Sequence, residues 1–494
     1  MSSEARHLHP AAMLVAAIKT IRRWVSAFVI PGIAVLASRG FSMRTIALIL
    51  VGALVAAALA GLWGFLSWRA TTYEVSGSAF RLRQGVLQKN ERTIPLDHVQ
   101  SVDTVQGIVQ RFFGVVEVRV ETAGGGAGEP DASLPALSRA DAEALRREIE
   151  GSLLEPVEEA AQPALLRRLT PRDLLIAGAT SGQIGVAFSL IAVVSQFFDD
   201  LLSESLAQRL FETLAPRSVA AALLLVGAFG VFAWLLAIAG TILAHAGFTL
   251  SRDGDFLYIK RGLLERREAT IPLARIQAVR VVEGLLRQPF GLAALRVESA
   301  GYGEASGVST TLFPLLARKD VEKLLLDAAP EFAVASILEP LPVRALRRYI
   351  FRSIVPVLLV AAAVALASPL ALDLVAAWGF FAALFLVFPA VLYGWLRYRD
   401  AGWAYQGDLL VVRSRLLART LAIAPRRRLQ SRGVMLSPFQ RRARLATFHA
   451  QVASGSGGAE LRVTDLGSDA AAALAEDLGP KARRGRRWSS PPRI

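Results

Sequence analysis

The stretch IPLDHVQS at residues 94–101 recurs as IPLARIQA at 271–278 and, more divergently, as APRRRLQS at 424–431. Longer segments align around these copies: Phe80–Gly125 matches Leu257–Tyr302 without a gap, and Leu410–Gly455 matches both more loosely. The third copy has Arg415 and Arg444 where the first two have glycines. Repetition on this scale predicts that the chain consists of three copies of one structural unit.

Within each copy the local pattern is that of a β domain. Phe80 and Leu82 alternate with Arg81 and Arg83, and a valine alternation with period two runs from 116 to 121. The prolines of the repeated stretch cannot donate to a strand ladder, so they mark a strand end or an edge. Glycine-rich stretches at 124–128, 301–307 and 454–458 predict hairpin turns rather than phosphate loops, because no Gly-Lys-Ser/Thr follows them.

Each copy closes with an amphipathic helix. In the first copy the helical segment 138–154 places Ala142, Leu145 and Ile149 on one face, and segments 317–329 and 468–478 follow the other copies. Six or seven short strands followed by one helix predict a small barrel or bent sandwich that the helix plugs at one end.

Long apolar runs precede each β region in pairs, and about 20 such residues cross a bilayer. Because the first run is short and contains Pro31-Gly32, it predicts a kinked or re-entrant span. A cleaved signal peptide does not fit, because no small-x-small site follows and a second run comes at once. The runs are Trp24–Ser38 with Ile46–Trp68, Leu174–Phe197 with Val219–Ala246, and Ile350–Ser368 with Leu374–Leu396.

Arginine placement predicts the orientation of these spans, because cytoplasmic segments carry an excess of Lys and Arg. The loop Phe198–Arg217 inside the second pair is mainly acidic, whereas the tail after residue 480 has six basic residues and no acidic one. Both termini and all three β regions are therefore predicted to be cytoplasmic in a multi-pass cell membrane protein. The segments before the second and third pairs are basic too, with Arg167, Arg168, Arg172, Arg344, Arg347, Arg348 and Arg352.

The composition limits the kinds of catalytic and metal-binding sites that the chain can form. Among 494 residues, 53% are hydrophobic, 20% are charged and none is cysteine, which removes disulfides and thiolate metal sites. The five histidines show no metal-ligand spacing inside a helix, and no nucleophile or paired acidic motif appears, so we expect no enzyme, no metal and no cofactor. A net charge of +15 on a membrane-bound chain points to the anionic inner leaflet as partner and not to nucleic acid.

The repeated motifs resemble those of the bacterial pleckstrin-homology-like (PH-like) family. The pattern consists of Gly-hydrophobic-hydrophobic, I-P-L-x-x-[IV]-Q-[SA], R-x-x-G-hydrophobic and V-x-[ST]-A-G, and the triple arrangement resembles the YdbT-type membrane proteins of that family. The resemblance covers nearly the whole chain and is weakest in the third copy. It implies an α+β fold in which each domain has seven strands and a C-terminal helix, a cell membrane location, and pairing with a smaller single-domain relative.

The predicted organisation follows from these observations. Each transmembrane helical hairpin is followed by a cytoplasmic PH-like β-barrel or sandwich with its C-terminal helix. The segments are an N-terminal segment and first pair at 1–70, PH-like domain 1 at 71–155, a linker and second pair at 156–246, domain 2 at 247–333, a linker and third pair at 334–400, the divergent domain 3 at 401–479, and a basic tail at 480–494.

We expect a non-enzymatic scaffold or adaptor, because three tethered modules raise the effective concentration of any multivalent partner. A homo-oligomer is compatible with this role. Basic residues near the strand turns are the candidate lipid or partner contacts, although a solvated strand face would look the same. These candidates are Lys260, Arg261, Arg266, Arg267, Arg426, Arg427 and Arg428, with Arg81, Arg83 and Lys89 in the first copy.

The alternative function is a component of a transporter or of an envelope-stress or antimicrobial-resistance membrane complex. The apolar runs contain few polar groups that could serve transport, and we expect helix–helix hydrogen bonds from them. Gly178 and Gly182, four residues apart in the run Leu174–Phe197, predict that this helix packs closely against another helix. The polar residues are Thr180, Ser181, Gln183, Ser189 and His245.

The recurring positions of the motif are predicted to serve the fold. For the glutamines we expect a buried hydrogen bond to the backbone, so that Gln277→Leu lowers the abundance of folded protein. The acids Glu121 and Glu298, replaced by Gln451 in the third copy, belong to the same class. The motif residues are Pro95, Gln100, Gly114, Pro272, Gln277, Gly291, Pro425 and Gln430.

Overall fold

The fold is that of a computed structural model of the full chain. It describes residues 5–21, 24, 42–122, 131–151, 163–181, 218–299, 311–333, 337–367, 385–454 and 459–479. The chain divides into two compact units. The first unit is Met1–Ile276, Leu286–Pro330 and Ser454–Gly457, and the second is Gln277–Leu285, Glu331–Ala453 and Gly458–Ile494.

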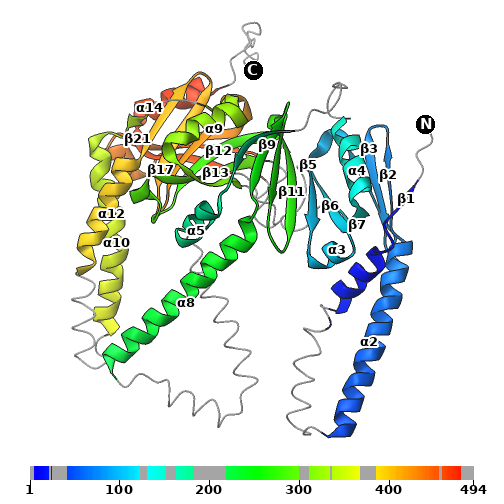
Figure 1. Ribbon diagram of the computed structural model, residues 1–494. Helices are drawn as coiled ribbons and strands as arrows, with labels where there is room; N and C mark the ends of the chain where they lie inside the picture. Colours follow the sequence, from blue (N-terminus) through cyan, green and yellow to red (C-terminus); the bar gives the residue numbers. More distant parts are fainter. Residues whose placement is uncertain are drawn as a thin grey trace, which may run out of the picture. The chain divides into compact units, whose positions relative to one another are not determined.

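The same order of elements occurs three times along the described chain (Figure 1). One strand is followed by two helices, three strands, a short 3₁₀ helix, three further strands and a closing helix. In repeat 1 these are β1 (Arg6–His7), the helix Ala12–Ile21, α2 (Met43–Arg69), β2 (Thr72–Ser76), β3 (Ala79–Gln84), β4 (Asn90–Pro95), η1 (Leu96–His98), β5 (Val99–Gln106), β6 (Val115–Thr122), β7 (Ala132–Ser138) and α4 (Arg139–Gly151), with the short α3 (Ile108–Phe112) after β5.

Repeat 2 follows the same plan. It consists of β8 (Ala164–Arg168), α5 (Pro171–Ala179), α8 (Val219–His245), β9 (Thr249–Asp253), β10 (Phe256–Arg261), β11 (Arg266–Pro272), η2 (Leu273–Arg275), β12 (Ile276–Glu283), η3 (Gln288–Phe290), β13 (Leu292–Ser299), β14 (Thr311–Ala317), η5 (Arg318–Asp320), α9 (Val321–Ala328) and η6 (Pro330–Phe332).

Repeat 3 completes the series. It consists of β15 (Glu339–Pro340), α10 (Val343–Ala367), α12 (Val387–Asp400), β16 (Gly402–Gln406), β17 (Leu409–Arg415), β18 (Arg419–Pro425), η8 (Arg426–Arg428), β19 (Leu429–Met435), α13 (Pro438–Arg442), β20 (Leu445–Val452), β21 (Ala459–Gly467) and α14 (Ser468–Asp477). The seven strands and closing helix of each repeat agree with the prediction.

Each repeat begins one strand earlier than predicted. The strands β8 and β15 lie in the segments assigned to linkers, yet β8 pairs with β9 and β15 pairs with β16. β1 pairs with β2 in the same way. The helical pair is therefore inserted after the first strand of its β domain, so two covalent connections join each helical pair to its domain.

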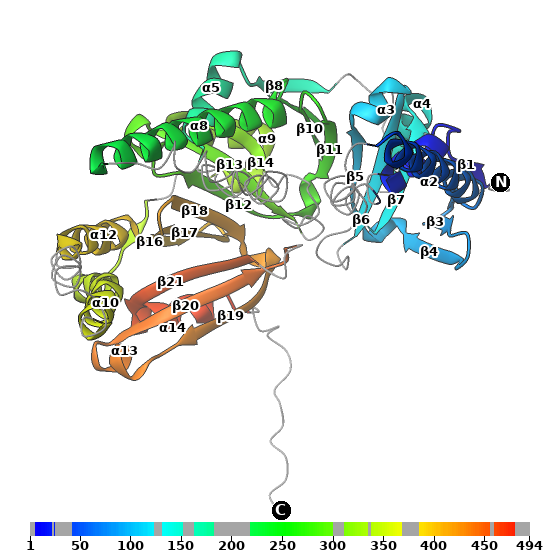
Figure 2. The same ribbon diagram turned by 90° about the horizontal axis from the view of Figure 1, so that it is seen from below.

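The strands form antiparallel sheets that continue from one repeat into the next. β1-β2-β3-β4 form a four-stranded sheet, and the order β7-β6-β5-β11-β10-β9-β8 joins the end of repeat 1 to the start of repeat 2 in the first unit (Figures 1 and 2). In the second unit β12-β18-β17-β16-β15 and β19-β20-β21 are the corresponding orders. This pairing between repeats was not predicted.

The repeated prolines end equivalent strands, as predicted. Pro95, Pro272 and Pro425 are the last residues of β4, β11 and β18, and each precedes a 3₁₀ helix. Gly114 and Gly291 have φ of 67° and 60°, which favours glycine. Arg444 has φ of 50° at the equivalent position, so the third repeat keeps this turn with a non-glycine residue.

The other divergent residue of repeat 3 changes the local structure. Arg415 belongs to β17, and its guanidinium lies 2.5 Å from Asp400 Oδ2. In the other repeats Gly85 and Gly262 have φ of 113° and 102° at this position. The glycine turn is therefore replaced by a longer strand that a buried ion pair holds in place.

The closing helices pack as predicted. Leu145 and Ile149 of α4 are fully buried and Ala142 is 4% exposed, in a core with Phe80 and Leu82. In the second unit Ala471 and Leu474 of α14 join the core of repeat 3. Arg81 and Arg83 are exposed, which confirms the alternation of β3. β6 differs, because Glu117 and Glu121 are buried together with the valines.

Two described helices are long and apolar enough to cross a membrane, Leu50–Arg69 in α2 and Leu223–His245 in α8. They correspond to the predicted runs Ile46–Trp68 and Val219–Ala246. α10 covers most of the run Ile350–Ser368, and α12 covers the end of the run Leu374–Leu396. Several predicted segments lie outside the described residues. They are the run Trp24–Ser38 except for Trp24, the run Leu174–Phe197 except for Leu174–Ser181, the loop Phe198–Arg217, and the tail after residue 480.

Candidate functional site

The β10–β11 hairpin of repeat 2 is fastened to the end of an apolar helix. The backbone N–H of Gly262 donates to the carbonyl of Ala246 at 2.8 Å, and that of Leu263 donates to the carbonyl of Leu243 at 2.9 Å. A Cβ on Gly262 would lie 1.9 Å from the Glu265 carbonyl oxygen, so only glycine permits this turn. The hairpin tip therefore lies at the end of α8, with Leu263 and Leu264 each 49% exposed.

A second loop meets this hairpin tip. Arg111 of α3 approaches the Leu263 carbonyl at 3.5 Å. Ile108 and Phe112 of the same short helix are 65% and 84% exposed. Apolar side chains from repeats 1 and 2 are thus exposed together beside the end of a membrane-length helix, which is an arrangement typical of an interaction surface.

Four predicted basic contacts lie next to the hairpin tip. Lys260, Arg261, Arg266 and Arg267 line a cavity of about 290 Å³ that also includes Ala246 and Leu263. Lys260 pairs with Glu268 at 3.2 Å and Arg267 with Glu265 at 2.7 Å. Burial, together with the charge of Arg267, lowers the pKa of Arg261 to about 10. Exposed Arg266 and half-exposed Lys260 are the members best placed to meet an anion.

We call this set the helix-end surface. It consists of Ile108, Phe112, Lys260, Leu263, Leu264 and Arg266. Apolar side chains beside long cationic ones suit the boundary between hydrocarbon and headgroups, where the stems remain in apolar surroundings and the charges reach water or phosphate.

Repeats 1 and 3 expose apolar hairpin tips at the equivalent position. Leu87 is 88% exposed, and Leu416 and Leu417 are 67% and 64% exposed. The repeat 3 hairpin also contacts a helix end, because Arg397 of α12 donates to the Arg415 carbonyl at 3.2 Å. An exposed apolar hairpin tip is therefore a property of the repeat and not of one domain.

Arg287 fastens another loop of repeat 2 to a helix end. Its guanidinium donates to the Ala177 carbonyl at 3.3 Å, to Thr180 Oγ1 at 3.1 Å and to the Pro314 carbonyl at 2.9 Å. Burial lowers the pKa of Arg287. Phe290, in the same loop, is 71% exposed. The exposed aromatic residue is thus held near the C-terminal end of α5.

The predicted arginine cluster of repeat 3 lies elsewhere. Arg426, Arg427 and Arg428 follow β18, at the opposite end of this strand from Leu416 and Leu417, and seven strand residues span about 23 Å. The cluster therefore lies at the far end of β18 from the hairpin tip that contacts the helix end.

The partners of Arg426 and Arg427 lie within the same unit. Arg426 donates to the Gly479 carbonyl and lies 3.9 Å from Asp408, while Arg427 pairs with Glu331 at 2.6 Å. Arg426 and Arg427 line an open cavity of about 510 Å³ with Arg432 and Leu478. Its charge and its position make it a candidate site for an acidic protein segment.

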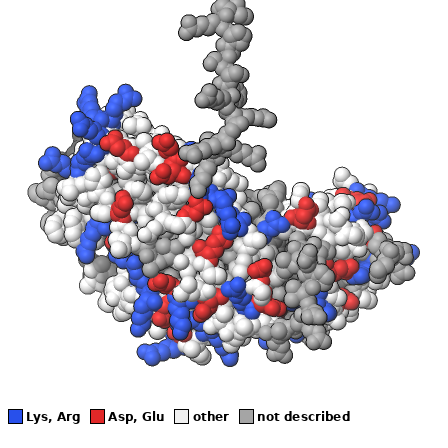
Figure 3. Space-filling view, turned by 90° about the horizontal axis from the view of Figure 1, so that it is seen from above, with Lys and Arg blue, Asp and Glu red and all other residues white. Residues whose placement is uncertain are grey.

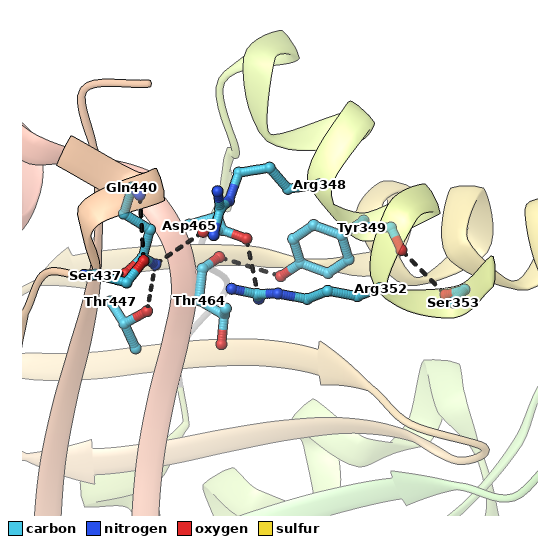
Figure 4. A network of polar contacts seen from close by, with 9 residues as sticks. All are labelled: Arg348, Tyr349, Arg352, Ser353, Ser437, Gln440, Thr447, Thr464 and Asp465. Carbon is cyan, nitrogen blue, oxygen red and sulfur yellow. Dashed lines mark hydrogen bonds and ion pairs between the residues drawn. The ribbon is translucent and has the colours of Figure 1, made fainter. Parts of the chain in front are cut away.

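A buried ionic network fastens α10 to the β domain of repeat 3 (Figure 4). Asp465 is fully buried and receives hydrogen bonds from Arg348 Nε at 3.0 Å and Gln440 Nε2 at 2.8 Å. Arg352 pairs with its second oxygen at 3.1 Å, and the Tyr349 hydroxyl donates to the Thr464 carbonyl at 3.1 Å. Arginines that indicated membrane orientation in the sequence therefore also join the helix to its domain.

The motif glutamines do not share one environment. Gln430 is exposed, so the expected buried hydrogen bond is wrong for the third repeat. Gln277 is half-buried, and the side chain of Gln100 lies outside the described residues. Pro95, Pro272 and Pro425 end strands, as predicted, and Gly114 and Gly291 have positive φ.

The polar residues of the apolar helices mostly bond within their own helix. Thr180 Oγ1 donates to the Ile176 carbonyl at 2.6 Å and Ser181 Oγ donates to the Gly178 carbonyl at 2.8 Å, so helix–helix bonds were the wrong expectation for both. A Cβ on Gly178 would lie 3.0 Å from Ile238 Cα, which confirms close packing there. Gln183, Ser189 and Gly182 lie outside the described residues.

On the face drawn in Figure 3, Lys and Arg side chains lie among Asp and Glu side chains, and other residues make up most of the described surface. Among the described residues, no group of three His, Asp or Glu side chains is arranged to hold a metal ion.

Comparison with known proteins matches this architecture. The family described as "Bacterial PH domain" matches the chain three times, at residues 11–153, 186–329 and 354–482. The "UPF0699 transmembrane protein YdbT" of Bacillus subtilis (strain 168) is 32% identical over 493 residues, covering 96% of this chain and 97% of that protein. No solved structure matches the chain.

Proposed function

The chain belongs to the bacterial PH domain family, and on this premise we propose that it is a non-enzymatic, multi-pass cell membrane protein whose PH-like domains form a cytoplasmic scaffold on the inner leaflet. The observation that carries the proposal is the attachment of the β10–β11 hairpin to the last turn of α8. A hairpin bonded to the end of a membrane-length helix has its tip at the boundary of the bilayer.

The helix-end surface combines apolar and basic side chains, which would both contribute to binding at this boundary. Leu263, Leu264 and Phe112 would enter the acyl boundary, and Lys260 and Arg266 would meet anionic headgroups. The arginine-lined cavity of repeat 3, at the other end of β18, would remain available to a soluble or membrane-bound protein partner. A smaller single-domain PH-like membrane protein is the partner that the family suggests.

A depth measurement tests the membrane contact. Because the chain has no cysteine, Leu264→Cys can carry a single environment-sensitive fluorophore on the full protein in lipid nanodiscs. We expect a blue-shifted emission that brominated lipids quench and aqueous iodide does not. Glu322→Cys, on the exposed face of α9, is the matched control and should show the reverse.

One quenching result would contradict the proposed membrane contact. Iodide quenching at Leu264→Cys equal to that at Glu322→Cys would place the hairpin tip in water and overturn the membrane contact. Glutamine at both Lys260 and Arg266 should weaken the response to anionic lipid while leaving the response in neutral lipid unchanged.

The scaffold role has a separate test. Co-purification from native membranes should recover the same protein partner with the unaltered chain and with Arg81→Glu, but not with Arg427→Glu. Recovery with all three chains would remove the arginine-lined cavity from the partner site. A reconstituted protein that moves solutes across the bilayer would favour the transporter alternative.

A further inference from the structure

Repeat 1 is joined to repeat 2 by one strand pairing. β5 and β11 lie side by side as antiparallel strands (Figures 1 and 2). This pairing joins the second sheet of one repeat to the first sheet of the next. Its register is Arg266↔Gln106, Arg267↔Val105, Glu268↔Thr104, Ala269↔Asp103 and Thr270↔Val102.

Repeat 2 is joined to repeat 3 by the equivalent strands in the same register. β12 pairs with β18 in the second unit, and Arg419 and Glu283, at the positions of Arg266 and Gln106, again face each other. The register is Arg419↔Glu283, Thr420↔Val282, Leu421↔Val281, Ala422↔Arg280 and Ile423↔Val279. A pairing that recurs residue for residue between divergent repeats is a defined interface.

The two strands that would make this pairing at the ends of the array have open edges among the described residues. β4 is an edge strand that corresponds to β11 and β18, and β19 is an edge strand that corresponds to β5 and β12. Asn90, Glu91, Arg92 and Thr93 are all exposed, whereas the equivalent stretch of β11, 267–270, is half-buried or buried. β19 is likewise more exposed than β12.

We propose that a second copy of this chain occupies these edges, so that β4 of one copy pairs antiparallel with β19 of another in the register of the internal junctions. This register places Thr93 opposite Arg432, Arg92 opposite Gly433, Glu91 opposite Val434 and Asn90 opposite Met435. The proposal rests on the strand edges and is independent of the membrane contact.

Three features favour a second copy as the occupant. The chain itself carries both strand types, and the internal junctions already show how they fit. The register sets Glu91 diagonal to Arg432 across the strands, within reach of an opposite-charge contact. An unpaired edge is also a ready template for strand addition.

The interface would be head-to-tail. The same patch does not meet itself, so each copy still presents one free edge after the first contact. Copies therefore assemble into a closed ring or an open row, with the β domains of every copy on the same side of the bilayer.

Cysteine cross-linking of the full chain in native membranes tests the proposal. Two populations with different tags carry Asn90→Cys and Met435→Cys, and a second set carries Glu91→Cys and Val434→Cys. Adjacent antiparallel pairs alternate between two geometries, so one set has the closer Cα separation, which suits a disulfide. Asn90→Cys with Arg432→Cys, three residues out of register, is the control.

We expect a cross-linked dimer only when the two members of an in-register set are mixed, and its loss in the out-of-register control. Three outcomes would overturn the proposal. One is no dimer although maleimide labels both sites on folded chains. Another is a dimer within one population alone, which indicates a symmetric contact. The third is a cross-link inside one chain when both cysteines are on the same copy.

Discussion

Asp465 provides the sharpest test of how a helix is joined to its β domain in repeat 3. Its side chain is fully buried, Arg348 and Gln440 donate hydrogen bonds to it, and Arg352 forms an ion pair with it. Asp465→Asn keeps the size of the side chain but removes the negative charge. The substitution therefore leaves Arg348, whose side chain is only 21% exposed, without its counter-ion.

The loss in free energy of unfolding depends on how deeply each arginine partner of Asp465 is buried. Removing one partner of a buried ion pair costs about 3–5 kcal/mol, because the other charge stays desolvated. Arg352 is 42% exposed, so its pair with Asp465 should contribute less than about 1 kcal/mol. We expect Asp465→Asn to lower the free energy of unfolding of repeat 3 by about 3 kcal/mol, mostly through Arg348.

Tryptophan fluorescence during thermal unfolding of the purified chain measures this effect, because Trp403 packs against the core of repeat 3. Asp477→Asn, an exposed aspartate on α14, is the matched control and should unfold like the unaltered chain. Double-mutant cycles with Arg348→Met and Arg352→Met should give the larger coupling energy for Arg348. An Asp465→Asn chain as stable as the control, or a larger coupling to Arg352, would refute the reasoning.

Three further predictions concern stability. Burial, reinforced by Asp103, raises the pKa of Glu121 from its ordinary value of 4.5 to about 8, so between these pH values the folded chain retains a proton that the unfolded chain has lost. The free energy of unfolding should therefore fall as pH rises from about 4.5 to 8, by on the order of 4 kcal/mol. Glu121→Gln should abolish this slope when unfolding is measured across that pH range. Arg444→Gly should stabilise repeat 3 by about 0.5–1 kcal/mol because φ is 50° there, whereas Gly291→Ala should destabilise repeat 2 by a similar amount; equal melting temperatures would contradict both. Gly262→Ala should cost about 2–3 kcal/mol, since its Cβ would meet the Glu265 carbonyl oxygen, and Gly254→Ala, with open space at its Cβ, should cost only about 1 kcal/mol in the same assay.

Local patterns were sufficient for the repeat and most of its elements. Proline removes a backbone donor wherever it stands, so Pro95, Pro272 and Pro425 indicated strand ends without knowledge of the partner strand. Helical periodicity likewise identified the buried face of α4, because the spacing of apolar residues along the helix is a local pattern. These inferences need only residues that are close in the chain.

Features that depend on distant partners were missed. The short strands β8 and β15 have no alternation of their own and form by pairing with β9 and β16. The pairing of β5 with β11 joins segments from different repeats, and alternation alone cannot name a partner. The role of Asp465 was hidden as well, because a single aspartate near a strand end is ordinary in sequence.

The candidate site was predicted in part. Lys260 and Arg266 were identified from their charge, but Leu263, Leu264 and Phe112 were not, since exposed apolar residues are recognised only once burial is known. The hairpin motif itself was a usable signal, because all three copies place two apolar residues after the turn position.

The proposed topology places the β domains of all three repeats on one side of the bilayer. Single cysteines at Ala144, Lys323 and Ala473, exposed on the closing helices of repeats 1, 2 and 3, can be labelled with a membrane-impermeant maleimide in oriented vesicles. All three cysteines should react in inside-out vesicles and none in right-side-out vesicles. Labelling of any one of them from the outer face would contradict it.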